Sequence, residues 1–318
     1  MAIVLDGSVL GLQLAVLGVG ISLVFGLSGV LDLAYGAKVV AAAIVGSLVL
    51  AGGGPVLLGV AVTVGLAVVL SLGIDRTVLA PVYRRHGEAR VVLSLLVTLA
   101  VAFVIDGVLV SRWPHAAFSL AVAGPPVDVL GVRMRGGSLL AAGLGLVALA
   151  ATFLLLHTTR AGRAIRCVIQ DEEGAQLCGI EPARVRTVVV VLSGALAGVV
   201  AVAQGLASSV AVADGFDLTI LAVVVAVVGG LGRVAGAAVA GVVLGLVHAL
   251  ATATVGASAT WVVLLLAAAV TIVLRPEGIL GLGGRAPRRH TARWSRRIAG
   301  PDRTTDDDAA DRAGEGRG

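Results

Sequence analysis

Long apolar runs alternate with short polar connections along almost the whole chain. Each run is rich in Val, Leu, Ala and Gly, and most approach the roughly 20 helical residues that cross a hydrocarbon core about 30 Å thick. We count nine runs, which cover approximately residues 9–29, 38–51, 56–74, 91–110, 138–156, 187–206, 218–231, 236–254 and 260–274. The pattern predicts an all-α polytopic membrane protein with about eight or nine transmembrane helices.

The composition supports the same class. Of 318 residues, 58% are hydrophobic and 14% are charged, whereas a soluble domain carries about 25% charged residues. The isoelectric point near 10.2 would also suit a protein that binds nucleic acid. However, the basic residues lie in the connections and near the C-terminus, as membrane topology alone requires. We therefore expect membrane lipid and no nucleic acid among the partners.

The basic residues gather in alternate connections, which predicts the orientation of the chain in the membrane. If the N-terminus lies outside, the outer connections hold only Arg112, Arg133 and Arg135. The inner side holds the rest: Lys38, four arginines in residues 75–90, five in residues 158–186, Arg233 and ten from Arg275 onward. The prediction is N-out and C-in.

The composition changes after the last apolar run. We assign residues 1–284 to a transmembrane domain and residues 285–318 to a disordered cytoplasmic tail, because the tail is charged and nearly free of apolar side chains. Its first half is basic and would lie on anionic lipid headgroups. The outer connection 111–137 has three prolines and a short alternating segment, which predict a small hairpin over the outer mouth.

Two of the runs, 38–51 and 218–231, are short, and each adjoins a glycine-rich break. The breaks are GLSGVLDLAYG at 26–36 and GGLGRVAG at 229–236. Short or interrupted spans in corresponding positions indicate a transport path and an internal repeat. The alternative is that both breaks are ordinary tight turns.

Polar side chains inside the apolar runs are few, and at membrane depth they are functional candidates. Asp32, Tyr35 and Gly36 would share one face of a helical break, unless Asp32 simply pairs with Lys38. Small residues at helical spacing in the first run favour either close helix packing or a cavity for solute. The candidate residues of the substrate pathway are Ser22, Gly26, Asp32, Tyr35, Gly36 and Gln204.

The sequence contains no recognisable catalytic, metal-binding or ATP-binding motif. Its five histidines and two cysteines make no metal-ligand cluster and no catalytic triad. The phosphate-binding pattern G-x-x-x-x-G-K-[ST] is missing, and the only lysine lies outside such a context. We predict no catalytic residue, no metal, no cofactor and no enzymatic activity, so any ATP must be bound by partner subunits.

The longest polar interruption, residues 159–186, is the most specific feature. Apolar positions from Ala161 to Ile169 follow helical spacing, and Arg163, Arg166 and Gln170 take the other face. Acidic residues 171–173 would open a second helix, which Gly179 would end. The segment is predicted to be a cytoplasmic helical hairpin that docks on a partner; the alternative is a solvated loop. Both cysteines lie in it and are expected to be buried.

The sequence resembles the LivH-like permeases of branched-chain amino acid ABC importers. The resemblance covers most of residues 8–284 and is carried by GISLVFGLSGVLDLAYGA, GRAIRCVIQDEEGAQLCGIEPARV, VVGGLGRVAGAAVAGVVLG and RPEGILG. It implies that residues 159–186 are the loop that couples the permease to an ATPase. The residues that it implicates in coupling are Gly162, Arg163, Arg166, Glu173, Gly179 and Ile180. Asp32 and Tyr35 stand where the family usually has Asn and His, and Gly232–Arg233 replaces its Gly-Ser step.

The resemblance also implies partners and a function. The partners would be a second permease subunit (in a homo- or heterodimer), ABC ATPase subunits and an extracytoplasmic solute-binding protein. Together they would import a small polar solute, branched-chain or other amino acids first, across the inner membrane. Alternatives are a urea, amide or sugar ABC permease, a secondary transporter that takes protons on Asp32 or Asp106, and a channel or membrane scaffold.

Overall fold

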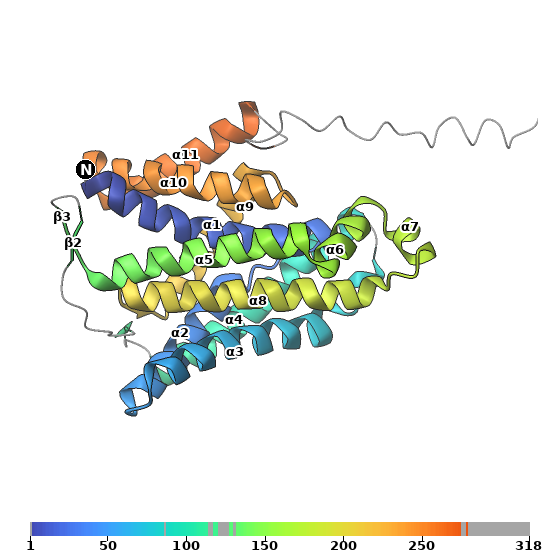
Figure 1. Ribbon diagram of the computed structural model, residues 1–318, viewed down its shortest axis with the longest axis horizontal. Coiled ribbons are helices and arrows are strands. Elements are labelled where there is room, and N and C mark those ends of the chain that lie inside the picture. The colour runs from blue at the N-terminus through green and yellow to red at the C-terminus, as the bar shows by residue number, and fades with distance from the viewer. Residues whose placement is uncertain are drawn as a thin grey trace, which may run out of the picture. The chain divides into compact units, whose positions relative to one another are not determined.

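The computed structural model describes residues 2–85, 87–113, 117–119, 127–129, 132–274 and 278, and within these ranges the chain is almost entirely helical (Figure 1). Each of the nine apolar runs forms a helix. The long helices are α1 (Ala2–Ser28), α2 (Tyr35–Ala51), α3 (Val56–Ile74), α4 (Glu88–Arg112), α5 (Gly136–Thr158), α8 (Pro182–Ala207), α9 (Asp214–Gly229), α10 (Val234–Val255) and α11 (Ala257–Leu274). The predicted all-α class is therefore correct.

Six helices in the described ranges are long and apolar enough to cross a membrane. They are Ile3–Ser28, Val56–Leu79, Glu88–Arg112, Gly136–Thr158, Pro182–Ala207 and Val234–Val255. The apolar helices α2 and α11 are shorter, and α9 has only 16 residues and two acidic residues in its first turn. The chain is thus a multi-pass membrane protein, while the predicted number of eight or nine spans and the N-out orientation remain predictions.

Short elements connect the helices at the two ends of the bundle. The π-helical turn η1 (Asp75–Leu79) and the 3₁₀ turn η2 (Val82–Arg84) join α3 to α4, and α6 (Arg160–Gln170) and α7 (Glu172–Leu177) join α5 to α8. At the opposite end, β1 (Ala117–Phe118) pairs antiparallel with β4 (Val210–Ala211). There also, β2 (Val127–Val129) pairs with β3 (Val132–Met134) as the hairpin predicted for this connection.

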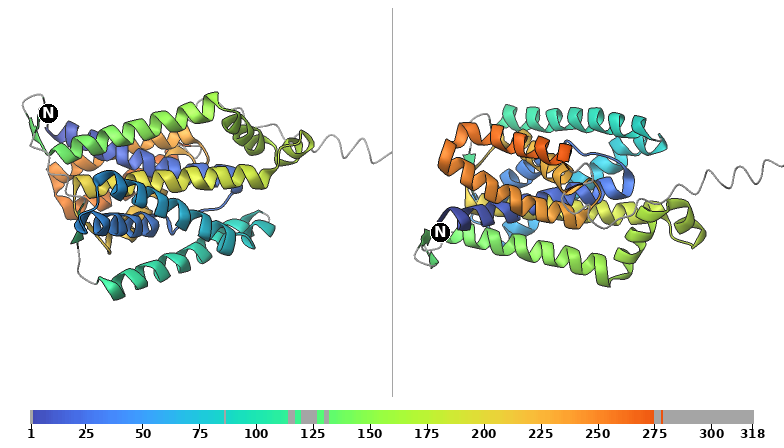
Figure 2. Two further views of the ribbon diagram at one scale, coloured as in Figure 1. Left: turned by 60° about the horizontal axis from the view of Figure 1, so that its bottom comes forward. Right: turned by 90° about the horizontal axis from the view of Figure 1, so that it is seen from above.

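Helix α1 lies at the centre of the bundle and contacts α5, α8, α9 and α10 (Figure 2). Glycines let α1 and α10 approach backbone to backbone: a Cβ at Gly245 would collide with the backbone of Gly11, and a Cβ at Gly241 with that of Ala15. Inside a membrane the hydrophobic effect does not drive helices together, because lipid is as apolar as the side chains. Helices associate there through close van der Waals packing, which small residues allow. Helix packing is therefore the correct interpretation of these positions.

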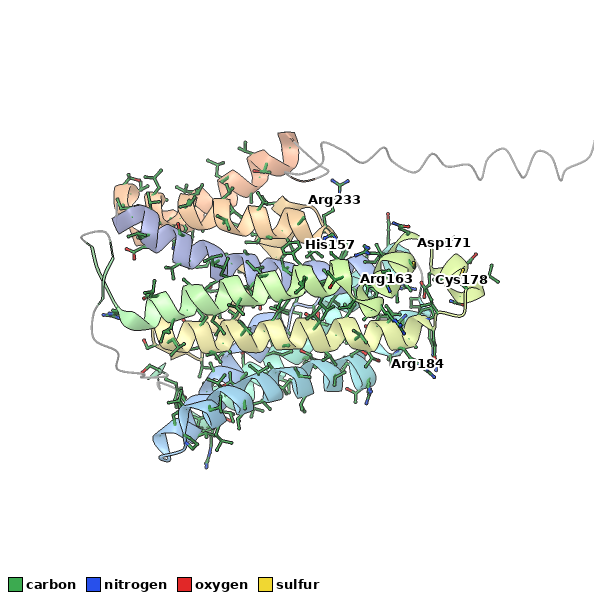
Figure 3. The ribbon with its side chains drawn as sticks, in the orientation of Figure 1. His157, Arg163, Asp171, Cys178, Arg184 and Arg233 are labelled. Carbon is green, nitrogen blue, oxygen red and sulfur yellow. The ribbon has the colours of Figure 1, made fainter. Side chains whose placement is uncertain are left out.

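The basic connections gather at one end of the bundle. Arg163 and Arg184 are labelled there in Figure 3, in α6 and at the start of α8, far from the N-terminus, and Arg233 is labelled at the connection between α9 and α10. Lys38 is an exception to the predicted pattern, because it is buried in α2 with 2% of its surface exposed and is not part of a connection. The predicted tail 285–318, and the RPEGILG motif apart from Gly278, lie outside the described residues.

Candidate functional site

The break between α1 and α2 is held in place by hydroxyl groups of α4. It begins at Gly29, which has a left-handed backbone with φ of +61°. The amide of Leu31 donates to Ser94 Oγ at 3.2 Å, and that of Leu33 donates to Thr98 Oγ1 at 3.0 Å. Since buried backbone amides need partners, Ser94 and Thr98 fix the shape of the break. The sequence analysis missed both, although two hydroxyls one turn apart in an apolar run were a visible signal.

Asp32 and Lys38 form a buried ion pair across this break. The carboxylate of Asp32 accepts a hydrogen bond from Lys38 Nζ, and its other oxygen accepts from the amide of Ala34 at 3.0 Å. The Lys38 side chain is 2% exposed and that of Asp32 9% exposed. Of the two interpretations of Asp32, pairing with Lys38 is the one observed. Such a pair is costly to break, because removal of one partner leaves an uncompensated buried charge.

Tyr35 and Gly36 join the break to the helices behind it. The Tyr35 hydroxyl donates to the carbonyl oxygen of Ser193 in α8 at 3.1 Å, and Ser193 Oγ donates to the carbonyl oxygen of Gly20 at 3.0 Å. The amide of Gly36 donates to Thr219 Oγ1 in α9 at 3.0 Å. Tyr35 and Asp32 have separate hydrogen-bond partners, but both face Lys38, whose Nζ pairs with Asp32 and lies 5.2 Å from the centroid of the Tyr35 ring.

A small cavity lies beside the ion pair. Its volume is about 10 Å³, close to the room that one water molecule needs. Its polar lining comes from three segments that are distant in sequence: Asp32 and Lys38 in the break and α2, Ser71 and Asp75 at the α3–η1 junction, and Ser193 in α8. In this conformation the break is therefore packed against its surroundings and this cavity is too small for a solute.

The other candidate pathway residues lie apart from one another. Ser22 is fully buried in α1, and its hydroxyl has no hydrogen-bond partner within the described part of the chain. Gly26 faces the connection between α9 and α10, where an added Cβ would lie 2.9 Å from Gly232 Cα. Gln204 is half-buried near the C-terminal end of α8, at the other end of the bundle. The structure therefore does not gather the six residues into one site.

The first helix of the 159–186 segment, α6, is tied to the end of α5. Thr159 caps it by accepting from the amide of Gly162 at 3.1 Å. A Cβ at Gly162 would collide with the carbonyl oxygens of Leu155 and Leu156, so the tight α5–α6 bend requires glycine. Arg166 donates to the carbonyl oxygen of Leu156, and Arg163 to that of Thr158 at 3.3 Å. Both arginines thus satisfy the free carbonyl groups of the α5 C-terminus.

The second helix, α7, is delimited by the residues predicted to start and stop it. Asp171 caps it by accepting from the amide of Gly174 at 3.0 Å. Gly179 ends it with φ of +78°, while the amide of Ile180 donates to the carbonyl oxygen of Ala175 at 3.0 Å. This is the hydrogen-bond pattern of a glycine-terminated helix.

The tip of α7 is apolar and exposed. The Leu177 side chain is 90% exposed, and Ile169 at the end of α6 is 40% exposed. The predicted burial of Cys167 and Cys178 is wrong, because both are exposed. Glu173 is exposed as well, whereas Ile180 is half-buried. Leu177 is thus an exposed apolar side chain on a short helix that is capped at both ends.

The sequence matches one protein family over residues 3–274. That family is described as the permease component of a branched-chain amino acid transport system. The chain belongs to this permease family. The match spans all the helices described above, so the resemblance seen in the sequence is confirmed and the chain is a multi-pass permease of the cell membrane.

Individual relatives agree with the family. The permease is 32% identical to the high-affinity branched-chain amino acid permease LivH of Escherichia coli K12 over 136 residues, which cover 42% of this chain and 44% of that protein. It is 27% identical to the probable LivH of Methanocaldococcus jannaschii over 252 residues, 74% of this chain and 76% of that one. The match with the E. coli relative thus spans less than half of that protein's length.

The permease also resembles a solved structure, PsaBC from Streptococcus pneumoniae in complex with Fab. The alignment covers 85% of this chain and 89% of that chain, with 14% identity and a TM-score of 0.46. A TM-score of this size does not establish a common fold.

Proposed function

We propose that this chain is a membrane-spanning subunit of an ATP-driven ABC importer. The observation that carries the proposal is the family match over residues 3–274. The subunit itself has no catalytic role in this proposal, and hydrolysis of ATP takes place in partner subunits. In this proposal the N-terminus lies outside. The six candidate spans and the three shorter apolar helices α2, α9 and α11 all cross the membrane.

The α6–α7 hairpin is the proposed contact with an ATPase subunit. The exposed Leu177 supports this, since an apolar side chain at the tip of a capped helix is suited to a groove on another protein. The ties of Gly162 and Arg166 to the end of α5 support it as well. A displacement of the hairpin would move α5 and α8 as rigid elements, which is the kind of motion by which bundles rock between states.

The proposed solute is a small polar molecule, with branched-chain amino acids first among the candidates. A binding protein outside the membrane delivers it to the end of the bundle near β2 and β3. It passes between this chain and a second permease subunit, along α1 and the break that contains Asp32 and Tyr35. Urea, short amides and sugars are the alternative solutes.

A proton-coupled secondary transporter finds less support in these contacts. Such a transporter needs a carboxylate that takes up and releases protons during its cycle. The carboxylate of Asp32 is already engaged by the ammonium group of Lys38 and by the amide of Ala34.

The test is solute uptake by the assembled importer. The chain is reconstituted in proteoliposomes with its cognate permease, ATPase and binding-protein subunits, and uptake of leucine, isoleucine, valine, urea, acetamide and ribose is measured with and without ATP. We expect ATP-dependent uptake of the branched-chain amino acids. Uptake that is equal with and without ATP would contradict the importer assignment, and ATP-dependent uptake of urea alone would contradict the solute.

A further inference from the structure

A single aromatic residue, Tyr83, lies where the hairpin, α4 and the break between α1 and α2 come together. It belongs to the turn η2, which connects α3 to α4. It is half-buried, and three of its groups are engaged by three different elements. These groups are its ring, its hydroxyl and its backbone carbonyl.

The ring of Tyr83 connects to the hairpin. The guanidinium of Arg186, in the second turn of α8, lies over the ring at 3.9 Å from its centroid. The same guanidinium approaches Glu172 of α7 at 4.0 Å. Arg186 is half-buried and its Nε has no hydrogen-bond partner in the described ranges, so the ring and Glu172 are the groups that face its positive charge. A shift of α7 or of the start of α8 therefore acts on Tyr83 directly.

The hydroxyl of Tyr83 connects to the buried ion pair. It donates to Asp75 Oδ1 at 2.5 Å, and Asp75 is 7% exposed. Asp75 lines the same small cavity as Asp32 and Lys38, which has room for about one water molecule. Burial, and then the hydrogen bond to Asp75, raise the pKa of Tyr83, so the hydroxyl stays protonated and able to donate at any physiological pH.

The backbone carbonyl of Tyr83 connects to the other side of the break. Arg90, in the first turn of α4, donates to this carbonyl at 3.3 Å and to the carbonyl oxygen of Ser28 at 3.1 Å. Ser28 is the last residue of α1, directly before the break. Tyr83 thus reaches the break from both sides, through Arg90 at its start and through Asp75 and the cavity at Asp32.

We propose that Tyr83 is the relay through which movement of the α6–α7 hairpin reaches the break between α1 and α2. Contacts run from Glu172 through Arg186 and Tyr83 to Asp75, and the Asp32–Lys38 pair lies across the small cavity that Asp75 also lines. When an ATPase moves α7, the contact between the guanidinium of Arg186 and the Tyr83 ring changes. The hydrogen bond from the Tyr83 hydroxyl to Asp75 changes with it. The relay rests on the proposed function, because it carries the motion that the ATPase supplies.

The variant Tyr83→Phe isolates the hydroxyl. It keeps the ring under Arg186 and the carbonyl that accepts from Arg90, and it removes only the bond to Asp75. Arg186→Gln removes the contact with the ring. The matched control is Arg76→Gln, which removes one positive charge from the turn η1 beside Asp75, where Arg76 is exposed. For each variant, the solute transported per ATP hydrolysed is measured in proteoliposomes of the complete complex, together with the amount of assembled complex.

The relay predicts a specific loss of coupling. Solute transported per ATP falls by between about twofold and thirtyfold in Tyr83→Phe and in Arg186→Gln, while Arg76→Gln behaves like the wild type. The double variant falls no further than the worse single variant, because both interrupt the same line of contacts. A purely structural role would lower the amount of complex and leave the ratio unchanged. An unchanged ratio in Tyr83→Phe, or an equal fall in Arg76→Gln, would overturn the proposal.

A second measurement tests the relay without transport and in the wild-type protein. Hydrogen exchange of the amides in residues 29–36 is compared in the permease with and without bound ATPase subunits. The relay predicts that ATPase binding changes exchange in this break, and identical exchange would contradict it. If the wild-type complex takes up no solute with ATP, the importer assignment fails; the exchange result then decides the relay by itself.

Discussion

Lys38→Met makes a sharp prediction, because it removes one partner of a fully buried ion pair. The methionine side chain would fill a similar apolar volume, so the main effect is the loss of the ammonium group beside Asp32. The Asp32 carboxylate, whose side chain is 9% exposed, would then keep one hydrogen bond within the described residues, from the amide of Ala34. Removal of one member of such a pair costs about 3–5 kcal/mol.

The double variant Asp32→Asn/Lys38→Met separates this charge effect from packing. It removes both charges and leaves an amide oxygen that can still accept from Ala34. We expect its free energy of unfolding to return to within about 1 kcal/mol of the wild type, since replacing a buried ion pair by neutral groups of similar size is often neutral or stabilising. The control Arg84→Met removes an exposed charge at the same end of the bundle and should change stability by less than about 0.5 kcal/mol.

The assay is denaturant-induced unfolding of the purified permease in detergent micelles, followed by circular dichroism. The reasoning about the ion pair would be refuted if Lys38→Met were as stable as the wild type. It would also be refuted if the double variant were as unstable as Lys38→Met, because the loss would then come from packing.

Three further predictions concern the bundle and the hairpin. Gly245→Leu should prevent the close approach of α1 and α10 and abolish recovery of folded protein, whereas Gly143→Leu, which meets open space, should be tolerated, as size-exclusion chromatography can show. Leu177→Asp should leave the unfolding midpoint unchanged and abolish co-purification of the ATPase, because the side chain is 90% exposed; retained ATPase would contradict the docking role. Gly179→Ala places a Cβ at φ of +78° and should destabilise the end of α7 by about 1–2 kcal/mol. Hydrogen exchange at the amide of Ile180 should become faster, and unchanged exchange would show that the turn does not depend on glycine.

The parts of the fold that depend on local sequence were predictable. The nine apolar runs all form helices, because length and hydrophobicity are properties of each run alone. The start and stop of α7 follow from Asp171 and Gly179, whose effects act within one helical turn. The bend at Gly162 belongs to the same category.

The contacts of the candidate site were harder to predict because they join residues distant in sequence. Tyr35 meets Ser193, 158 positions away, and the amide of Gly36 meets Thr219, 183 positions away. No local pattern encodes such pairings. Lys38 was misplaced for a related reason: the positive-charge rule treats a lysine near the start of a short span as part of a connection, whereas the break before α2 turns it toward Asp32.

The cysteines were misjudged because apolar character was taken as a sign of burial. In α6 the buried positions are Gly162, Ile165 and Val168, and Cys167 lies beside them on the exposed side. Cys178 lies at the exposed C-terminal end of α7 next to Leu177. Apolar character alone therefore did not predict burial in this segment, and the proposed docking on an ATPase subunit would use such exposed apolar side chains.

The energy source of transport is the most direct test of the central claim, that a separate ATPase drives this permease. Leucine accumulation is measured in two sets of proteoliposomes, one with the permease alone under an imposed proton gradient and one with the complete complex and ATP supplied to the ATPase subunits. The account predicts accumulation only in the second set, and its loss when ATP is replaced by a non-hydrolysable analogue. Accumulation by the permease alone on the proton gradient would contradict it.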